Sequence, residues 1–145
     1  MPLKGLVRSP GARLPSGATI QKACQAMHDT NIGAVAVVDG EKLEGVFTYR
    51  DLIDRVILRM REPGEVTLGE VMTRDVEWIS IDRSPGDALR LMVEKDYTHL
   101  PVLDETGRLA GVVTLRSLLE HKIHQLADEL DVMTSYLSID GSGGN

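Results

Sequence analysis

The chain has 145 residues and a formal net charge of −6, with 42% hydrophobic and 3% aromatic residues. This length suits a domain with its own core, and the composition is that of an ordinary globular protein. The acidic balance disfavours a general nucleic-acid binder, because the phosphate backbone is itself negative. Cys24 is the single cysteine, which excludes an internal disulfide and fits a reducing compartment. No signal-peptide core or membrane-spanning apolar run is evident, so we expect a cytoplasmic protein.

The first half of the chain predicts a helix, two strands and a second helix. Residues 34–38 and 43–47 are short, β-branched runs joined by the turn residues Asp39 and Gly40, as in a hairpin. The preceding helix has apolar residues at the i, i+3, i+4, i+7 spacing of one face, namely Ile20, Ala23, Cys24 and Met27. The following helix has the expected apolar face Leu52, Ile53, Val56, Ile57 and Met60.

The linking segment predicts a short helix and then a strand. Thr67 and Glu70 have the spacing of a capping box, in which each side chain bonds the other residue's backbone at the start of a helix. The run 76–80 predicts the strand that enters the second half.

The second half repeats the first. Residues 84–118 align with residues 19–52, and the second copy has one extra residue at its hairpin turn. A change of one residue in a turn is what two copies of one unit tolerate most easily. The second copy predicts a helix with Ser84 as its N-cap, Pro85 as its first residue and Asp87 as the reciprocal cap. Its strands are expected at 100–103 and 109–113.

Three features together resemble the CBS domain family: the tandem β-α-β-β-α unit, the segment VMTRDV between the copies, and the motifs GVFTYRD and GVVTLRS that end them. The resemblance covers about residues 6–124. It implies an α+β fold in which two repeats pack sheet against sheet as a pseudo-twofold pair (a Bateman module) with two clefts between them. It also implies that such pairs commonly form homodimers and bind adenosine-containing ligands in the clefts.

Thr48 and Asp51 in the first motif have two interpretations. They form a capping box, which would stabilise the helix by about 0.5–2 kcal/mol. Alternatively, they bind the vicinal hydroxyls of a ribose, while the nearby helix N-terminus favours a phosphate. The residues alone favour the cap. The family resemblance favours the ribose, because members use this Asp for the ribose hydroxyls, and both interpretations can hold together.

The second motif departs from the pattern, because Ser117 replaces the acid and a hydroxyl is a weaker partner than a carboxylate. This counts against full occupancy of the second cleft. His99 stands where family members often place a basic residue against phosphate, although it could be an ordinary strand-end histidine. Arg50 and Arg116 either reach a phosphate or are solvated. The predicted nucleotide-binding residues are Thr48, Arg50, Asp51, His99, Leu100, Pro101, Thr114, Arg116 and Ser117.

The helix that closes the second copy continues beyond the repeat. Its apolar residues are spaced 4, 3, 4, 3, 4, as in the seam of a coiled coil: Leu119, Ile123, Leu126, Leu130, Met133 and Leu137. Such a seam predicts a partner helix from a second protomer, the alternative being that the helix folds back on its own domain. The predicted organisation is a first repeat over 6–62, an inter-repeat segment over 63–78, a second repeat over 79–124, a helical extension over 125–138 and a disordered tail over 139–145.

These features predict a regulatory module that senses AMP, ADP or ATP between the repeats and passes the signal through a homodimer or a partner protein held by the C-terminal helix. NAD and S-adenosylmethionine are related alternatives. The opposing hypothesis is a ligand-free dimerisation scaffold. No enzyme is expected, because no nucleophile–base pair or Walker-type phosphate loop is evident. No required cofactor, metal, nucleic acid or membrane is expected either, and His121 and His124 are interpreted as surface residues rather than metal ligands.

Overall fold

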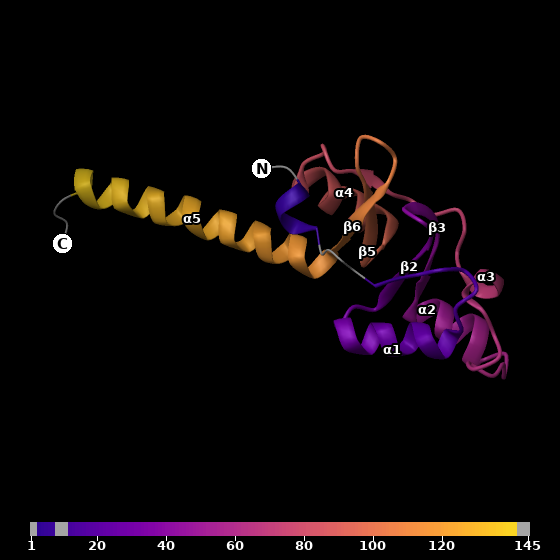
Figure 1. Cartoon of the computed structure of the whole chain (residues 1–145). Helices are drawn as coiled ribbons and strands as arrows, with labels where there is room; N and C mark the ends of the chain where they lie inside the picture. The colour runs from indigo at the N-terminus through magenta and orange to yellow at the C-terminus, as the bar shows by residue number, and fades with distance from the viewer. Residues whose placement is uncertain (1–2, 8–11, 142–145) are drawn as a thin grey trace.

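The computed structural model describes residues 3–7 and 12–141, and side chains as far as Leu137. Each half forms one three-stranded sheet (Figure 1) in which the first pair of strands is parallel and the second pair is antiparallel. The predicted hairpins are confirmed. The first sheet contains β1 (Arg13–Leu14), β2 (Ala34–Asp39) and β3 (Lys42–Thr48), and the second contains β4 (Ile79–Ser80), β5 (His99–Leu103) and β6 (Leu109–Thr114).

Helix α1 (Ile20–Thr30) covers the first sheet as its periodicity predicts. Thr19 is the N-cap, and its hydroxyl accepts a hydrogen bond from the backbone N–H of Lys22. Ile20, Ala23 and Met27 are buried in the core of the first half. Cys24 lies at the edge of that core, where burial raises the pKa of its thiol.

The helical segment after β3 differs from the prediction. A single turn, α2 (Tyr49–Asp51), passes into a π-helical stretch, η2 (Leu52–Ile57), in which Leu58 and Arg61 bond carbonyls five residues earlier. This wider turn rotates successive side chains away from the 3.6-residue period assumed above. The predicted apolar face is wrong in part, and Met60 lies beyond the helix, in a turn with φ 54°. Val56 is buried and Leu52 is half-buried, but Ile53, Ile57 and Met60 are exposed, and Met60 is 94% exposed.

The linking segment and the second half follow their capping signals closely. Helix α3 (Leu68–Val71) begins with the predicted Thr67–Glu70 capping box, and α4 (Pro85–Lys95) begins with the box between Ser84 and Asp87. The strand expected at 76–80 is shorter than predicted, because only β4 pairs with β5.

The N-terminal segment packs on the second half rather than on the first repeat. In the short 3₁₀ helix η1 (Leu3–Leu6), Leu3 is fully buried in the second core, beside Met92 and Leu118. Figure 1 shows this segment lying beside α4 and the start of α5. The chain therefore crosses between its two halves before the first repeat begins, and the repeat boundaries given above stay predictions.

The two sheets meet through a small apolar cluster of Ala36, Val38 and Leu109. Arg13 adds a hydrogen bond from its guanidinium to the carbonyl oxygen of Ala110, at 3.1 Å. Helix α5 (Leu115–Gly141) starts on the second half and extends beyond the body of the protein (Figure 1), which confirms the predicted helical extension. Residues 139–141 were predicted to belong to a disordered tail, and this is wrong because α5 continues through them; the rest of that tail, 142–145, lies outside the described residues. None of the helices described is long and apolar enough to cross a membrane.

Candidate functional site

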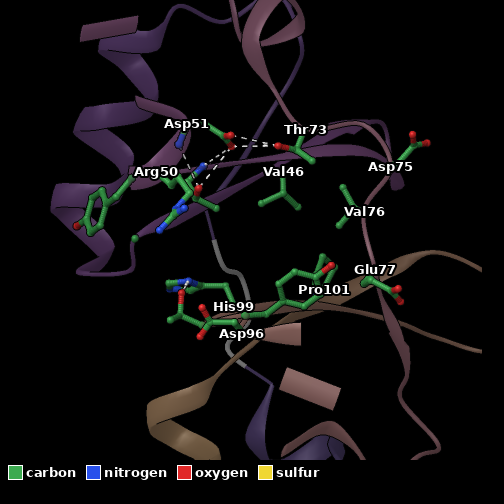
Figure 2. A pocket seen from close by; sticks show the side chains of 15 residues that line it. Val46, Arg50, Asp51, Thr73, Asp75, Val76, Glu77, Asp96, His99 and Pro101 are labelled. Carbon is green, nitrogen blue, oxygen red and sulfur yellow. Dashed lines mark hydrogen bonds between the residues drawn. The ribbon is translucent and has the colours of Figure 1, made fainter. Parts of the chain in front are cut away.

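A cavity of about 310 Å³ lies between the two halves (Figure 2), and we call it the first cavity. The start of α2 forms one wall, the linking segment forms a second, and the start of β5 forms a third. Its lining residues are Gly33, Val46, Thr48, Tyr49, Arg50, Asp51, Thr73, Asp75, Val76, Glu77, Asp96, Tyr97, Thr98, His99 and Pro101.

Asp51 is the most constrained group in this cavity. Its side chain accepts a hydrogen bond from the backbone N–H of Thr48 at 3.1 Å, and its own N–H donates to the Thr48 hydroxyl at 3.4 Å. The capping box is therefore confirmed. The Thr73 hydroxyl donates to Oδ1 at 3.1 Å, and Nε of Arg55 lies 3.7 Å from the same oxygen. Asp51 is only 7% exposed, so these contacts hold a carboxylate in a fixed orientation beside the cavity.

Thr73 reaches Asp51 because the linking segment pairs with strand β3. Thr73 and Val46 exchange two backbone hydrogen bonds, at 2.9 and 3.0 Å. Gly45 makes this close approach possible, since a Cβ there would lie 2.6 Å from the carbonyl oxygen of Thr73. The glycine of the first motif thus leaves room for the linking segment to pack against β3.

His99 and Arg50 lie on opposite walls of the first cavity. Nδ1 of His99 lies 2.9 Å from the hydroxyl oxygen of Thr98. Burial lowers the pKa of His99, so its ring is neutral at pH 7. Arg50 is exposed, and it forms no ion pair with any residue that the structure describes. The positive charge available to a ligand in this cavity therefore comes from Arg50.

The lowered pKa of His99 predicts a pH effect on stability. The unfolded chain binds a proton on this histidine more readily than the folded chain does, so stability is lost as the pH falls below the ordinary histidine value of about 6.5. We expect His99→Gln to lose less stability than wild type between about pH 7.5 and about pH 5.5, as measured by urea unfolding. His28→Gln, on the exposed face of α1, is the control. An equal pH dependence in wild type and His99→Gln would contradict the prediction.

A second, larger cavity of about 760 Å³ lies where the other cleft is expected, and His99 contributes to both cavities. Thr114 and Arg116 line this second cavity, and Arg116 forms an ion pair with Glu120 at 3.0 Å. Ser117 is not among its lining residues. The Ser117 hydroxyl instead donates to the carbonyl oxygen of Thr114 and accepts a bond from the Thr114 hydroxyl.

The predicted site residues therefore fall into three groups. Five line the first cavity: Thr48, Arg50, Asp51, His99 and Pro101. Thr114 and Arg116 line the second. Leu100 is fully buried in the core of the second half, and neither it nor Ser117 lines either cavity.

Sequence reasoning missed the contribution of the linking segment. Thr73, Asp75, Val76 and Glu77 all line the first cavity. The segment VMTRDV was part of the pattern that suggested the family, and this was the available signal. Nothing in the sequence alone indicated that its threonine would meet Asp51, because the two residues are 22 positions apart.

The chain contains two copies of one unit of helices and strands, and the cavity between them is large enough to hold a small molecule. These features define a tandem-repeat module. The profile of the CBS domain matches residues 4–58 and 68–124. The chain belongs to the CBS domain family and contains two tandem repeats.

Similar proteins include an uncharacterised protein of Methanopyrus kandleri, 35% identical over 96 residues, which cover 65% of this chain and 48% of that protein. The chain spans about half to three fifths of the length of such curated relatives. The cytosolic domain of the Mg²⁺ channel MgtE, solved in complex with ATP, has a TM-score of 0.66 and 30% identity, covering 80% of this chain and 46% of that one. The CBS domain pair of protein MJ0100, solved with 5′-methylthioadenosine and S-adenosyl-L-methionine, has a TM-score of 0.76 and 23% identity, covering 86% and 98%.

Proposed function

We propose that this protein is a non-enzymatic regulatory module that binds an adenosine-containing ligand in the first cavity. AMP, ADP and ATP are the first candidates from the sequence, and S-adenosylmethionine is a related alternative. The observation that carries the proposal is the fixed Asp51 carboxylate beside a half-open, partly apolar cavity. Each carboxylate oxygen has two acceptor positions, so Oδ1 keeps one free for a ribose hydroxyl after its hydrogen bond from Thr73.

The apolar part of the cavity suits a purine. Val46, Val76 and Pro101 face the space between Asp51 and His99 (Figure 2), and a base between them would be removed from water. The hydroxyl of Thr48 and the guanidinium of Arg50 lie on the same wall as Asp51 and would bind the ribose and one phosphate. The solved relatives that carry ATP, or 5′-methylthioadenosine and S-adenosylmethionine, support a ligand with an adenosine moiety.

Thermal unfolding with AMP, ADP, ATP, NAD and S-adenosylmethionine tests this proposal. A ligand at about 100 times its dissociation constant stabilises the folded state by about 2.7 kcal/mol. In a chain of this length we expect the midpoint to rise by about 10 °C. The variant Asp51→Asn keeps an oxygen that accepts the Thr48 N–H but loses the carboxylate, so we expect it to lose most of the ligand-induced rise.

Asp87→Asn is the matched control for Asp51→Asn. Asp87 forms the equivalent capping box with Ser84 at the start of α4, and it lines neither of the two cavities described above. It should keep the full ligand-induced rise. If none of these ligands stabilises wild type, the sensor proposal is wrong and the ligand-free dimerisation scaffold becomes the better account. If a ligand stabilises wild type and both variants respond alike, Asp51 does not bind that ligand and the proposed site is wrong.

We propose further that the output runs through a homodimer formed by α5. Every described side chain from Lys122 to Leu137 is exposed, including all the seam residues beyond Leu119. An isolated helix is marginal in water, and an apolar seam gains stability only when another surface covers it. A second copy offers the same uncharged seam, so the two helices are mutually complementary. In a dimer, a ligand would act through a difference in its affinity for two dimer arrangements.

A further inference from the structure

We infer that the first cavity selects adenosine ligands with an uncharged or positively charged 5′ group over adenosine di- and triphosphates. This inference rests on the proposed function, because it concerns which ligand of that class the cavity accepts. Its basis is the charge of the lining. Asp75, Glu77 and Asp96 line the cavity in addition to Asp51 and Arg50, and the side chains of these three acids are exposed.

The three additional carboxylates are not neutralised within the described part of the chain. Asp51 has Arg55 at 3.7 Å, whereas the side chains of Asp75, Glu77 and Asp96 form no ion pair or hydrogen bond with any described residue. Because all three are exposed, their negative charge acts at the mouth of the cavity and is sensitive to salt.

These carboxylates lie at the rim of the cavity, and in Figure 2 those of Asp75 and Glu77 point away from the space between Asp51 and His99. Asp75 and Glu77 lie on the linking segment, and in Figure 2 they stand well apart from Asp96, which precedes β5. A chain of phosphates leaving the cavity on either side would approach a carboxylate. Arg50 can neutralise one phosphate, and the neutral ring of His99 adds no second positive charge at pH 7.

The size of the cavity counts against the longest ligands, the triphosphate and the dinucleotides. Its volume of about 310 Å³ is at the lower end of the range for small-molecule sites, which runs from about 300 to about 1,000 Å³. A nucleoside or a mononucleotide fits such a space more completely than a triphosphate or a dinucleotide does. Size and charge thus favour a compact ligand with little negative charge.

Isothermal titration calorimetry tests the inference with adenosine, 5′-methylthioadenosine, S-adenosylmethionine, AMP and ATP, in EDTA at fixed ionic strength. Of adenosine, 5′-methylthioadenosine and S-adenosylmethionine, we expect the one with the lowest dissociation constant to bind at least about tenfold more tightly than ATP. The affinity of AMP should lie between that of this ligand and that of ATP. The ratio should fall as salt is raised, because exposed charges are screened.

The variant Asp75→Asn/Glu77→Gln/Asp96→Asn removes the three charges with little change in shape. Asp96 has a left-handed backbone with φ 59°, which asparagine also adopts, as Asn31 does at the matching position of the first copy. We expect this variant to bind ATP at least about threefold more tightly than wild type and to bind adenosine with unchanged affinity. The matched control is Glu65→Gln/Asp82→Asn/Glu105→Gln, which removes three exposed charges outside the lining and should leave both affinities unchanged.

The outcomes separate the inference from the proposed function. If none of the five compounds binds, the proposed function fails and the inference fails with it. If ATP binds wild type most tightly, the proposed function stands and the inference is overturned. The inference is also overturned if wild type and the triple variant disfavour ATP by the same factor. The carboxylates would then not be the cause of the weaker ATP binding.

Discussion

Replacing Phe47 by alanine is expected to lower the free energy of unfolding by about 3–5 kcal/mol, a large part of the total stability of a small domain. Phe47 is the single phenylalanine of the chain and is fully buried among Ile20, Met27 and Val35. The aliphatic side chains around it relax only partly into the space that the ring leaves. The cavity left by the lost ring therefore adds to the loss of buried apolar area.

Urea unfolding of Phe47→Ala, Phe47→Leu and Val93→Ala measures this effect. The leucine variant fills most of the space and should lose clearly less stability than the alanine variant. Val93 is exposed on α4, so its truncation should change stability by no more than about 0.5 kcal/mol. A loss below about 1 kcal/mol in Phe47→Ala would show that the first half is not packed around this ring. Since Phe47 directly precedes Thr48, the same variant should also weaken ligand binding.

The second large effect is expected on the solution mass. If α5 pairs with a second copy, wild type is a dimer, and Leu130→Glu is expected to be a monomer at micromolar concentration. A glutamate at this seam position would place one charge from each helix in the dry contact between them. Light scattering coupled to size-exclusion chromatography gives the mass directly.

Val132→Glu is the matched control for Leu130→Glu. The two residues lie on the same exposed stretch of α5 and have similar exposure, 63% for Leu130 and 69% for Val132, but Val132 is outside the seam. Val132→Glu should therefore remain a dimer. A monomeric wild type, or equal masses for the two variants, would show that the seam is not the contact.

Local signals in the sequence determined the elements of this protein. The capping boxes at Thr48, Thr67 and Ser84 start helices where predicted, and the β-branched runs form the two hairpins. These features depend on residues three or four positions apart, or on a short turn. The repeat then placed the same elements in the second half, and the motif of the first copy identified Thr48, Arg50 and Asp51 as residues that line one cavity.

The tertiary structure decided what depends on contacts between distant segments. Thr73 meets Asp51 because the linking segment pairs with β3 beside Gly45, and Leu3 is buried in the second core although it precedes the first repeat. The π-helical turn after Asp51 leaves exposed residues that an α-helical period would bury. A hydrophobic pattern in the sequence gives the period of a helix or strand. The cavity, which has more carboxylates than positive charges around it, forms only when the two halves of the chain come together.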